Sequence, residues 1–239
     1  MKIAIIGYGR MGKTIERLAT DMGHEIVLKV NSKNAAQYDT KMLQSSGCDV
    51  AIEFSLPQLA LANIKTSMAA GVPHVCGTTA WLSEWDAALA SMKQHNGALL
   101  YASNFSVGVN IFFAINKKLA QLMNNQPQYR PSIHEIHHTG KVDAPSGTAI
   151  TLAEGIIGEL DRKSSWAAEP TEDEQLAVTS ERTDPAPGTH HVTYDSDIDS
   201  IEIVHTAKSR DGFALGSILA AEYLIGKKGL HTMSQVLGM

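Results

Sequence analysis

Residues 134–149, HEIHHTGKVDAPSGTA, concentrate titratable side chains in one short stretch. Three histidines, a glutamate, a lysine and an aspartate lie beside a Pro-Ser-Gly-Thr turn, in a chain of 239 residues that has ten histidines. Two kinds of site would use such a set. One is a zinc site of the HExxH type, and the other is a site that transfers protons and binds an anion.

The zinc hypothesis depends on His134, Glu135 and His138, which have the spacing of the metallopeptidase motif. That motif requires a helix, on which the two histidines are one turn apart. Here Pro131 precedes the segment, two isoleucines favour a strand, and a Thr-Gly pair follows. In a strand the two histidines would be roughly 13 Å apart, too far to share one ion. We therefore expect a strand and no bound metal.

The second hypothesis gives each polar residue a task. Residues 146–148 follow a proline and are expected to begin a helix, whose free N–H groups and cap hydroxyl attract a carboxylate. Lys141 and one or both of His137 and His138 would place cations and transferable protons beside that anion site. Histidine is the natural proton donor near neutral pH, so we expect a protonated imidazole there.

A glycine-rich loop near the start of the chain predicts a second site. In KIAIIGYGRMGKTIERLA a short apolar strand leads into Gly7-x-Gly9-x-x-Gly12 and then into an amphipathic helix. Gly7 permits a tight turn, Gly9 lets the backbone approach a pyrophosphate, and Gly12 lets helix and strand pack closely. The helix N-terminus then favours the anionic diphosphate. This pattern predicts dinucleotide binding.

The dinucleotide pattern also expects an acidic residue about 20 residues further on, to hold the adenine ribose. Asn31 stands there instead, with Lys33 close by, and Arg10 of the first loop is a further cation near the ribose. Without a carboxylate to repel a 2′-phosphate, the site is expected to accept NADPH at least as well as NADH. The alternative for Lys33 is a solvated loop side chain without contact to the cofactor.

Two later turns follow predicted strands and are expected to reach the nicotinamide end of the cofactor. They are residues 77–79 and residues 103–105. The carboxyl ends of parallel strands lie at one edge of a sheet, where ligands bind. Each is otherwise an ordinary small polar turn.

The elements that must position these residues alternate in the first half of the chain. The predicted strands are KIAII, EIVLKV, DVAIEF, VPHVC and ALLYA, and the predicted helices are residues 11–22, 57–70 and 83–95. Apolar strands separated by helices indicate a doubly wound parallel sheet of the Rossmann type. The polar connection 31–47 is expected to hold a short or irregular helix.

The second half has a different pattern. We expect helices at residues 107–124 and 146–160, a strand in SIHEIHH, a polar stretch over 161–188, and a hairpin of HHVTYDS and SIEIVHTAK. Such a set indicates an α+β domain with a mixed or antiparallel sheet. The predicted domains are 1–105, completed by C-terminal helices within 212–239, and 106–211. In the tail we expect a helix through residue 225 and a shorter one after 229.

Composition limits the possible partners. The formal net charge of −5 and the ordinary hydrophobic fraction of 44% argue against nucleic acid and membrane partners. Two cysteines far apart in sequence and the lack of an apolar leader favour a cytoplasmic protein. Small molecules are therefore the expected ligands.

The stretch EIHHTGKVDAPSGTA resembles the E-x-H-H-x-x-K-x-D-x-P-S-G-T-A motif of the dihydrodipicolinate reductase family. The likeness extends over nearly the whole chain, through IIGYGRMG, CGTT, ASNFSVGVN and SRDGFALGSILAAEYL. The resemblance implies reduction of 4-hydroxy-tetrahydrodipicolinate, a small cyclic dicarboxylate, to tetrahydrodipicolinate with loss of water, in lysine and diaminopimelate biosynthesis. It also implies NADPH or NADH as the cofactor, and a homotetramer built through the sheet of the second domain.

The same resemblance implies roles for individual residues. His137 would be the catalytic acid and Lys141 a second proton donor, with substrate contacts from His138, Ser146, Gly147 and Thr148. The residues implied to hold the cofactor are Gly7, Tyr8, Gly9, Arg10, Met11, Gly12, Asn31, Lys33, Gly77, Thr78, Thr79, Ala102, Ser103, Asn104 and Phe105. Asp143 is expected to shape the loop.

Two departures from the family pattern leave the cofactor preference open. The chain is shorter than many relatives between the second and third strands, and Asn31 lacks the acid often found there. Two rival functions also stay open: a nicotinamide dehydrogenase for a linear amino or hydroxy acid, and a nucleotide sensor without catalysis. A sensor would not need the cluster of histidines and lysine.

Overall fold

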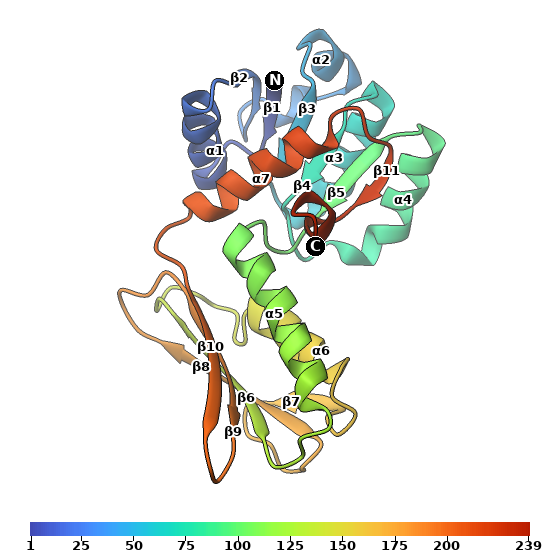
Figure 1. Cartoon of the computed structure of the whole chain (residues 1–239). Helices are drawn as coiled ribbons and strands as arrows, with labels where there is room; N and C mark the ends of the chain where they lie inside the picture. Colours follow the sequence, from blue (N-terminus) through green and yellow to red (C-terminus); the bar gives the residue numbers. More distant parts are fainter. The chain divides into compact units, whose positions relative to one another are not determined.

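The computed structural model describes residues 1–239 and divides into two compact units (Figure 1). The first unit contains residues 1–107 and 210–239, and the second contains residues 108–209. Each unit has its own sheet and its own buried core.

The sheet of the first unit has six parallel strands in the order β11-β5-β4-β3-β1-β2. The strands are β1 (Lys2–Ile6), β2 (Glu25–Val30), β3 (Val50–Glu53), β4 (His74–Cys76), β5 (Ala98–Tyr101) and β11 (Gly229–His231). The central strands β1, β3 and β4 are almost entirely buried, as expected for a parallel sheet covered on both faces. This confirms the predicted Rossmann-type sheet.

The helices of this unit are α1 (Arg10–Asp21), α2 (Thr40–Ser45), α3 (Pro57–Ala70), α4 (Trp85–Gln94), α7 (Asp211–Leu224) and α8 (Met233–Val236), with 3-10 turns at Ala35–Gln37 and Leu82–Glu84. Local sequence sets their ends: α3 begins with a proline and ends at Gly71, whose φ of 74° only glycine adopts readily. The connection 31–47 holds only a short turn and the short helix α2, as predicted.

The second unit has a five-stranded mixed sheet in the order β10-β9-β6-β8-β7. Its elements are α5 (Val107–Met123), β6 (Arg130–His137), α6 (Gly147–Ile157), β7 (Ser165–Ala167), β8 (Gln175–Arg182), β9 (Thr189–Asp195) and β10 (Ser200–Thr206). β6 pairs parallel to β8 and antiparallel to β9, and β9 and β10 form the predicted hairpin. Residues of α5 and α6 pack with one face of the sheet in a shared core.

Three strands were not predicted from the sequence: β7, β8 and β11. The stretch 161–188, expected only to be polar, contains β7 and β8, and β8 buries only Leu176 and Val178 among polar neighbours. The shorter helix expected after residue 229 is present as α8, but it is preceded by β11, which pairs with β5. All three strands have a weak local signal, because pairing with a neighbouring strand decides their conformation.

No helix of the chain combines the length and the apolar character needed to cross a lipid bilayer.

Candidate active site

The glycine loop between β1 and α1 has the geometry that a dinucleotide phosphate requires. Gly7 has a φ of +92°, and a Cβ on it would lie 2.0 Å from the carbonyl oxygen of Phe54. A Cβ on Gly12 would lie 2.7 Å from the carbonyl oxygen of Gly7. A Cβ on Gly9 would meet no protein atom within 4 Å. The fold itself therefore requires Gly7 and Gly12, whereas Gly9 borders open space at the start of α1.

Two cavities lie along the carboxyl edge of the first sheet and share Gly9, Phe54 and Ser55. The first, about 400 Å³, is also lined by predicted residues Gly7, Tyr8 and Asn31. The second, about 320 Å³, is also lined by predicted residues Arg10, Met11, Gly77, Thr78 and Thr79. Gly9, Phe54 and Ser55 therefore connect the two cavities.

Other predicted cofactor residues lie elsewhere in the loops. Lys33 is exposed, is not among the residues lining the two cavities, and donates its backbone N–H to Oδ1 of Asn31 at 2.8 Å. Residues 102–105 are not among the lining residues either. Phe105 is buried against the ring of Phe54 at a centroid distance of 5.8 Å, and Oδ1 of Asn104 accepts the N–H of Ser106 at 2.9 Å.

The lining residues that sequence analysis missed include Tyr38, Phe54 and Ser55. Phe54 and Ser55 directly follow β3, at the same sheet edge as the glycine loop. The rule that ligands bind beyond the carboxyl ends of parallel strands was the signal that could have found them.

In the second unit, β6 separates the residues of the HExxH pattern. Glu135 and His137 are buried with the helix-covered face, whereas His134 lies on the other face, with Nδ1 at 2.9 Å from Oγ1 of Thr179. His138 follows the end of the strand. Because the zinc motif requires a helix, the structure excludes the metallopeptidase hypothesis.

Glu135 is a buried carboxylate that sequence analysis considered only as part of a zinc motif. Its oxygens accept the N–H of Ser146 at 3.0 and 3.1 Å, the hydroxyl of Ser180 at 2.8 Å and Nη2 of Arg182 at 2.9 Å. Burial alone would raise its pKa, but contacts from His190 and these three donors hold the pKa of Glu135 well below its usual range. It is a fixed negative charge.

His137 lies beside that charge. Its Nδ1 is 3.4 Å from Oε2 of Glu135, and its ring centroid is 5.0 Å from that of His190. Burial is the main cause that lowers the pKa of His137 to about 4; the charge of Glu135 opposes this shift, and His190, Lys141 and Arg182 add to it. In the ligand-free protein the imidazole is therefore neutral near pH 7, where we expected a cation.

Lys141 and Arg182 lie near His137 and are joined through Asp143. Nζ of Lys141 lies 2.8 Å from both carboxylate oxygens of Asp143, and the carbonyl oxygen of Asp143 accepts Nη2 of Arg182 at 2.6 Å. Asp143 thus orients Lys141 and the loop, in keeping with the loop-shaping role expected for it. A Cβ on Gly188 would lie 3.1 Å from Nε2 of His137, so the backbone of this glycine closes one side of the ring.

The start of α6 completes the cluster. Oγ of Ser146 accepts the N–H of Ala149 at 3.2 Å and lies 3.2 Å from Nε2 of His190. Ser146 is buried and both its hydroxyl and its N–H are engaged within the protein, whereas Gly147 is exposed and Thr148 is partly exposed. Ser146 therefore fixes the helix end, and the accessible atoms belong to the two residues after it.

We expect Ser146→Ala to destabilise the protein by about 0.5–2 kcal/mol, because the helix loses its cap. Denaturant unfolding would measure this, and the Michaelis constant for substrate should change by less than about threefold because the serine acts through the helix end. An unchanged unfolding curve with a tenfold higher Michaelis constant would contradict the capping role.

Two buried groups have donor atoms within 4.8 Å of one another, the spacing that a metal ion could use: Glu135 with His137 and His190, and Glu53 with His74 and Cys76. Each carboxylate accepts several hydrogen bonds from protein donors. These bonds account for both arrangements without an ion.

A Rossmann-type unit with a phosphate-binding glycine loop, followed by a mixed α+β unit with an acid–base cluster, defines a class of two-domain nicotinamide-dependent reductases and dehydrogenases. Residues 1–105 match the family model of the dihydrodipicolinate reductase N-terminus, and residues 108–237 match that of its C-terminus. The chain belongs to the dihydrodipicolinate reductase family.

Individual relatives agree with that assignment. The 4-hydroxy-tetrahydrodipicolinate reductase of Christiangramia forsetii is 46% identical over 237 residues, covering 99% of this chain and 98% of the relative. The enzyme of the same name from Neisseria meningitidis serogroup A is 33% identical and covers 100% and 98%. A solved dipicolinate-bound dihydrodipicolinate reductase from Paenisporosarcina sp. TG-14 shares the fold, with 18% identity, 97% coverage of both chains and a TM-score of 0.75.

Proposed function

We propose that this chain reduces 4-hydroxy-tetrahydrodipicolinate to tetrahydrodipicolinate with loss of water, using NADPH or NADH, as a step of lysine and diaminopimelate biosynthesis. The observation that carries the proposal is the family match across both units, joined to the cluster of Glu135, His137 and Lys141 beside the start of α6.

The residues of the first unit fit the nicotinamide cofactor. Gly9 leaves space for the diphosphate at the N-terminus of α1, Arg10 adds positive charge there, and Asn31 lines the cavity assigned to the adenosine half. Gly77, Thr78 and Thr79 would line the nicotinamide half. When bound, the reduced cofactor supplies the hydride.

The substrate dicarboxylate would bind in the second unit. The N–H groups in the first turn of α6, at Gly147 and Thr148, suit one carboxylate, since a helix N-terminus favours anions. His138 and the ammonium of Lys141 add donors from the loop after β6. Ser146 supports this anion site by capping the helix.

His137 would then deliver a proton. Two substrate carboxylates add negative charge near its ring, which raises its pKa, because a nearby anion favours the imidazolium. The fixed carboxylate of Glu135, 3.4 Å from Nδ1, orients the ring and stabilises the charged form. His137 would release the proton as electron density builds on the reduced imine, and Lys141 is the second donor.

One assay tests the reaction. The absorbance of each reduced cofactor is followed with freshly condensed pyruvate and aspartate semialdehyde as the source of substrate. Oxidation of the cofactor is expected only with the condensed product. Turnover of a linear amino or hydroxy acid instead would favour the rival dehydrogenase, and cofactor binding without any turnover would favour the sensor.

Lys33→Ala tests the cofactor preference. We propose that the ammonium of Lys33 approaches the 2′-phosphate, so this variant should raise the Michaelis constant for NADPH by about threefold to tenfold and leave that for NADH unchanged, as for one exposed ion pair. Steady-state kinetics with both cofactors give the comparison. Equal values for the variant and the wild type would mean that Lys33 is only a solvated side chain.

We propose that residues 1–105 with 212–239 bind the cofactor, and that residues 106–211 bind substrate and form the oligomer. Hydride and acceptor must meet, so the two units would close about hinges near Phe105 and Asp211 when both ligands bind. An X-ray scattering profile with cofactor and dipicolinate, identical to that of the free protein, would argue against closure.

We further propose a cytoplasmic homotetramer. α5 and α6 cover one face of the second sheet, and the other face carries His134, His191 and the half-exposed Val204. This uncovered face suits contact with further copies, and the two free cysteines suit a reducing compartment. Light scattering should give the mass of four chains.

A further inference from the structure

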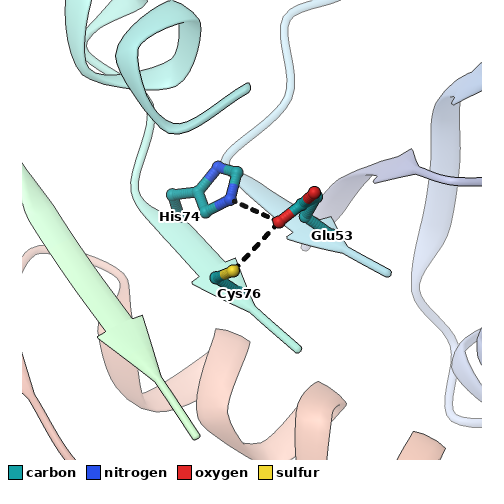
Figure 2. Close-up of side chains that lie close together, drawn as sticks. All are labelled: Glu53, His74 and Cys76. Carbon is teal, nitrogen blue, oxygen red and sulfur yellow. Dashed lines mark hydrogen bonds and ion pairs between the residues drawn. The ribbon is translucent and has the colours of Figure 1, made fainter. Parts of the chain in front are cut away.

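A second buried carboxylate, Glu53, lies at the end of β3 in the first unit. Figure 2 shows His74 and Cys76 of β4 directed at it. Sγ of Cys76 is 3.0 Å and Nε2 of His74 is 3.6 Å from Oε2 of Glu53, and all three side chains are completely buried. A charge without any solvent contact requires protein donors on both of its oxygens.

The other oxygen, Oε1, receives the remaining donors. Nδ2 of Asn63 and Oγ1 of Thr78 each lie 3.1 Å from it, and the hydroxyl of Ser55 donates to it as well. Oγ1 of Thr78 in turn accepts the backbone N–H of Ser55 at 2.8 Å. A single carboxylate oxygen therefore joins the loop after β3 to the loop after β4.

Those two loops line the cofactor cavities. Ser55 borders both cavities, and Thr78 borders the second. Burial alone would raise the pKa of Glu53, but its contacts, led by His74, lower the pKa to about 2. The group is ionised under all working conditions, so its hydrogen bonds are the strong, charge-assisted kind.

We propose that Glu53 is a positioning residue that holds the Ser55 loop and the Gly77–Thr79 loop in one geometry for cofactor binding. This inference rests on the proposed function, because it assigns the cavities to the nicotinamide cofactor. Glu53 is completely buried and is not among the residues that line the cavities, so it would act only through the residues that it orients.

The test is Glu53→Gln, with the dissociation constant for NADPH measured by titration calorimetry without substrate. An amide oxygen has two lone pairs and no charge, so it cannot accept all three donors that Oε1 now accepts. We expect the dissociation constant to rise about tenfold, and kcat at saturating cofactor to stay within about twofold of wild type, as for the loss of one charged hydrogen bond. If Glu53→Gln does not fold, Glu53→Asp, which keeps the charge but shortens the side chain that reaches the three donors, is used with the same expectation for the dissociation constant.

His74→Gln is the matched control. It changes a contact of the same carboxylate on Oε2, where no cavity-lining residue binds, and should lower stability without changing the affinity for NADPH. An unchanged dissociation constant in Glu53→Gln, or an equal rise in His74→Gln, would overturn the inference. Wild-type protein that binds NADPH but does not turn over the substrate would defeat the proposed function alone.

Metal analysis of the purified protein tests the alternative that Glu53, His74 and Cys76 bind a metal ion. We expect no stoichiometric zinc, because protein donors already satisfy the carboxylate. One zinc per chain that is lost in His74→Gln would overturn the inference and make the group of Glu53, His74 and Cys76 a metal site.

Discussion

Replacing His137 with glutamine is expected to lower kcat by about 10² to 10⁴-fold, the usual effect of a lost general acid. Glutamine keeps a polar side chain next to Glu135 but has no proton to transfer near neutral pH. The cofactor affinity should be unchanged, because His137 belongs to the second unit and the cofactor cavities to the first. Stopped-flow or steady-state measurements at saturating substrate give the comparison.

The chain offers a matched control on the same strand. His134 belongs to β6, like His137, but its ring lies on the uncovered face of the sheet beside Thr179. His134→Gln should keep kcat within about twofold of wild type, because its ring lies on the face of the sheet opposite the Glu135 and His137 cluster. An equal loss of kcat in both variants would mean that any substitution in β6 lowers activity. That result would contradict the role of His137 as the proton donor.

The pH dependence of kcat/KM in the wild type is a second test of His137 as the proton donor. The pKa of this residue is lowered to about 4 in the ligand-free protein, so its protonated fraction grows as pH falls from 8 toward 5. Since kcat/KM reports the free enzyme, it should rise over that interval if His137 is the proton donor. In His137→Gln the rise should disappear.

The lowered pKa of His137 also makes the stability of the protein depend on pH. A folded-state pKa below the ordinary value of 6.5 means that the unfolded chain binds more protons between pH 4 and 6.5. The stabilisation from a neutral His137 is therefore complete above pH 6.5 and is lost as the pH falls toward 4. His137→Gln should unfold with less dependence on pH in that window.

Replacing Gly9 with alanine is expected to raise the dissociation constant for the cofactor by at least about tenfold, without lowering the melting temperature. The new Cβ meets no protein atom within 4 Å, so the fold accepts it. It would occupy the space through which the backbone approaches the diphosphate. Calorimetric titration and thermal unfolding of the same preparation measure the two quantities.

Alanine variants of two other glycines are the comparisons for Gly9→Ala. Gly7→Ala should unfold at lower temperature, because its Cβ would lie 2.0 Å from a backbone oxygen and its φ is +92°. Gly147→Ala also meets no neighbour within 4 Å, but at the start of α6, so it should raise the Michaelis constant for substrate and leave cofactor affinity unchanged. If Gly9→Ala bound the cofactor normally, the diphosphate would not lie at this loop.

Much of the molecule follows from local sequence. The apolar runs of β1, β3 and β4, the glycines between β1 and α1, and the serine before α6 each carry their own signal within about ten residues. β7, β8 and β11 do not, because short or largely polar strands form only against a neighbour. The expected fold class was right for that reason, while these three strands were missed.

The sequence by itself determined which residues can do chemistry: the glycine loop, the paired histidines, Lys141 and the cap at Ser146. Only the tertiary structure decided how they are arranged. Pairing of β6 with β8 brings Arg182 next to Glu135, 47 positions earlier in the chain, and the register with β9 places His190 there too. Burial then makes His137 neutral, although its type suggested a cation. Charge state depends on solvent and on neighbours in space, and a linear pattern contains neither.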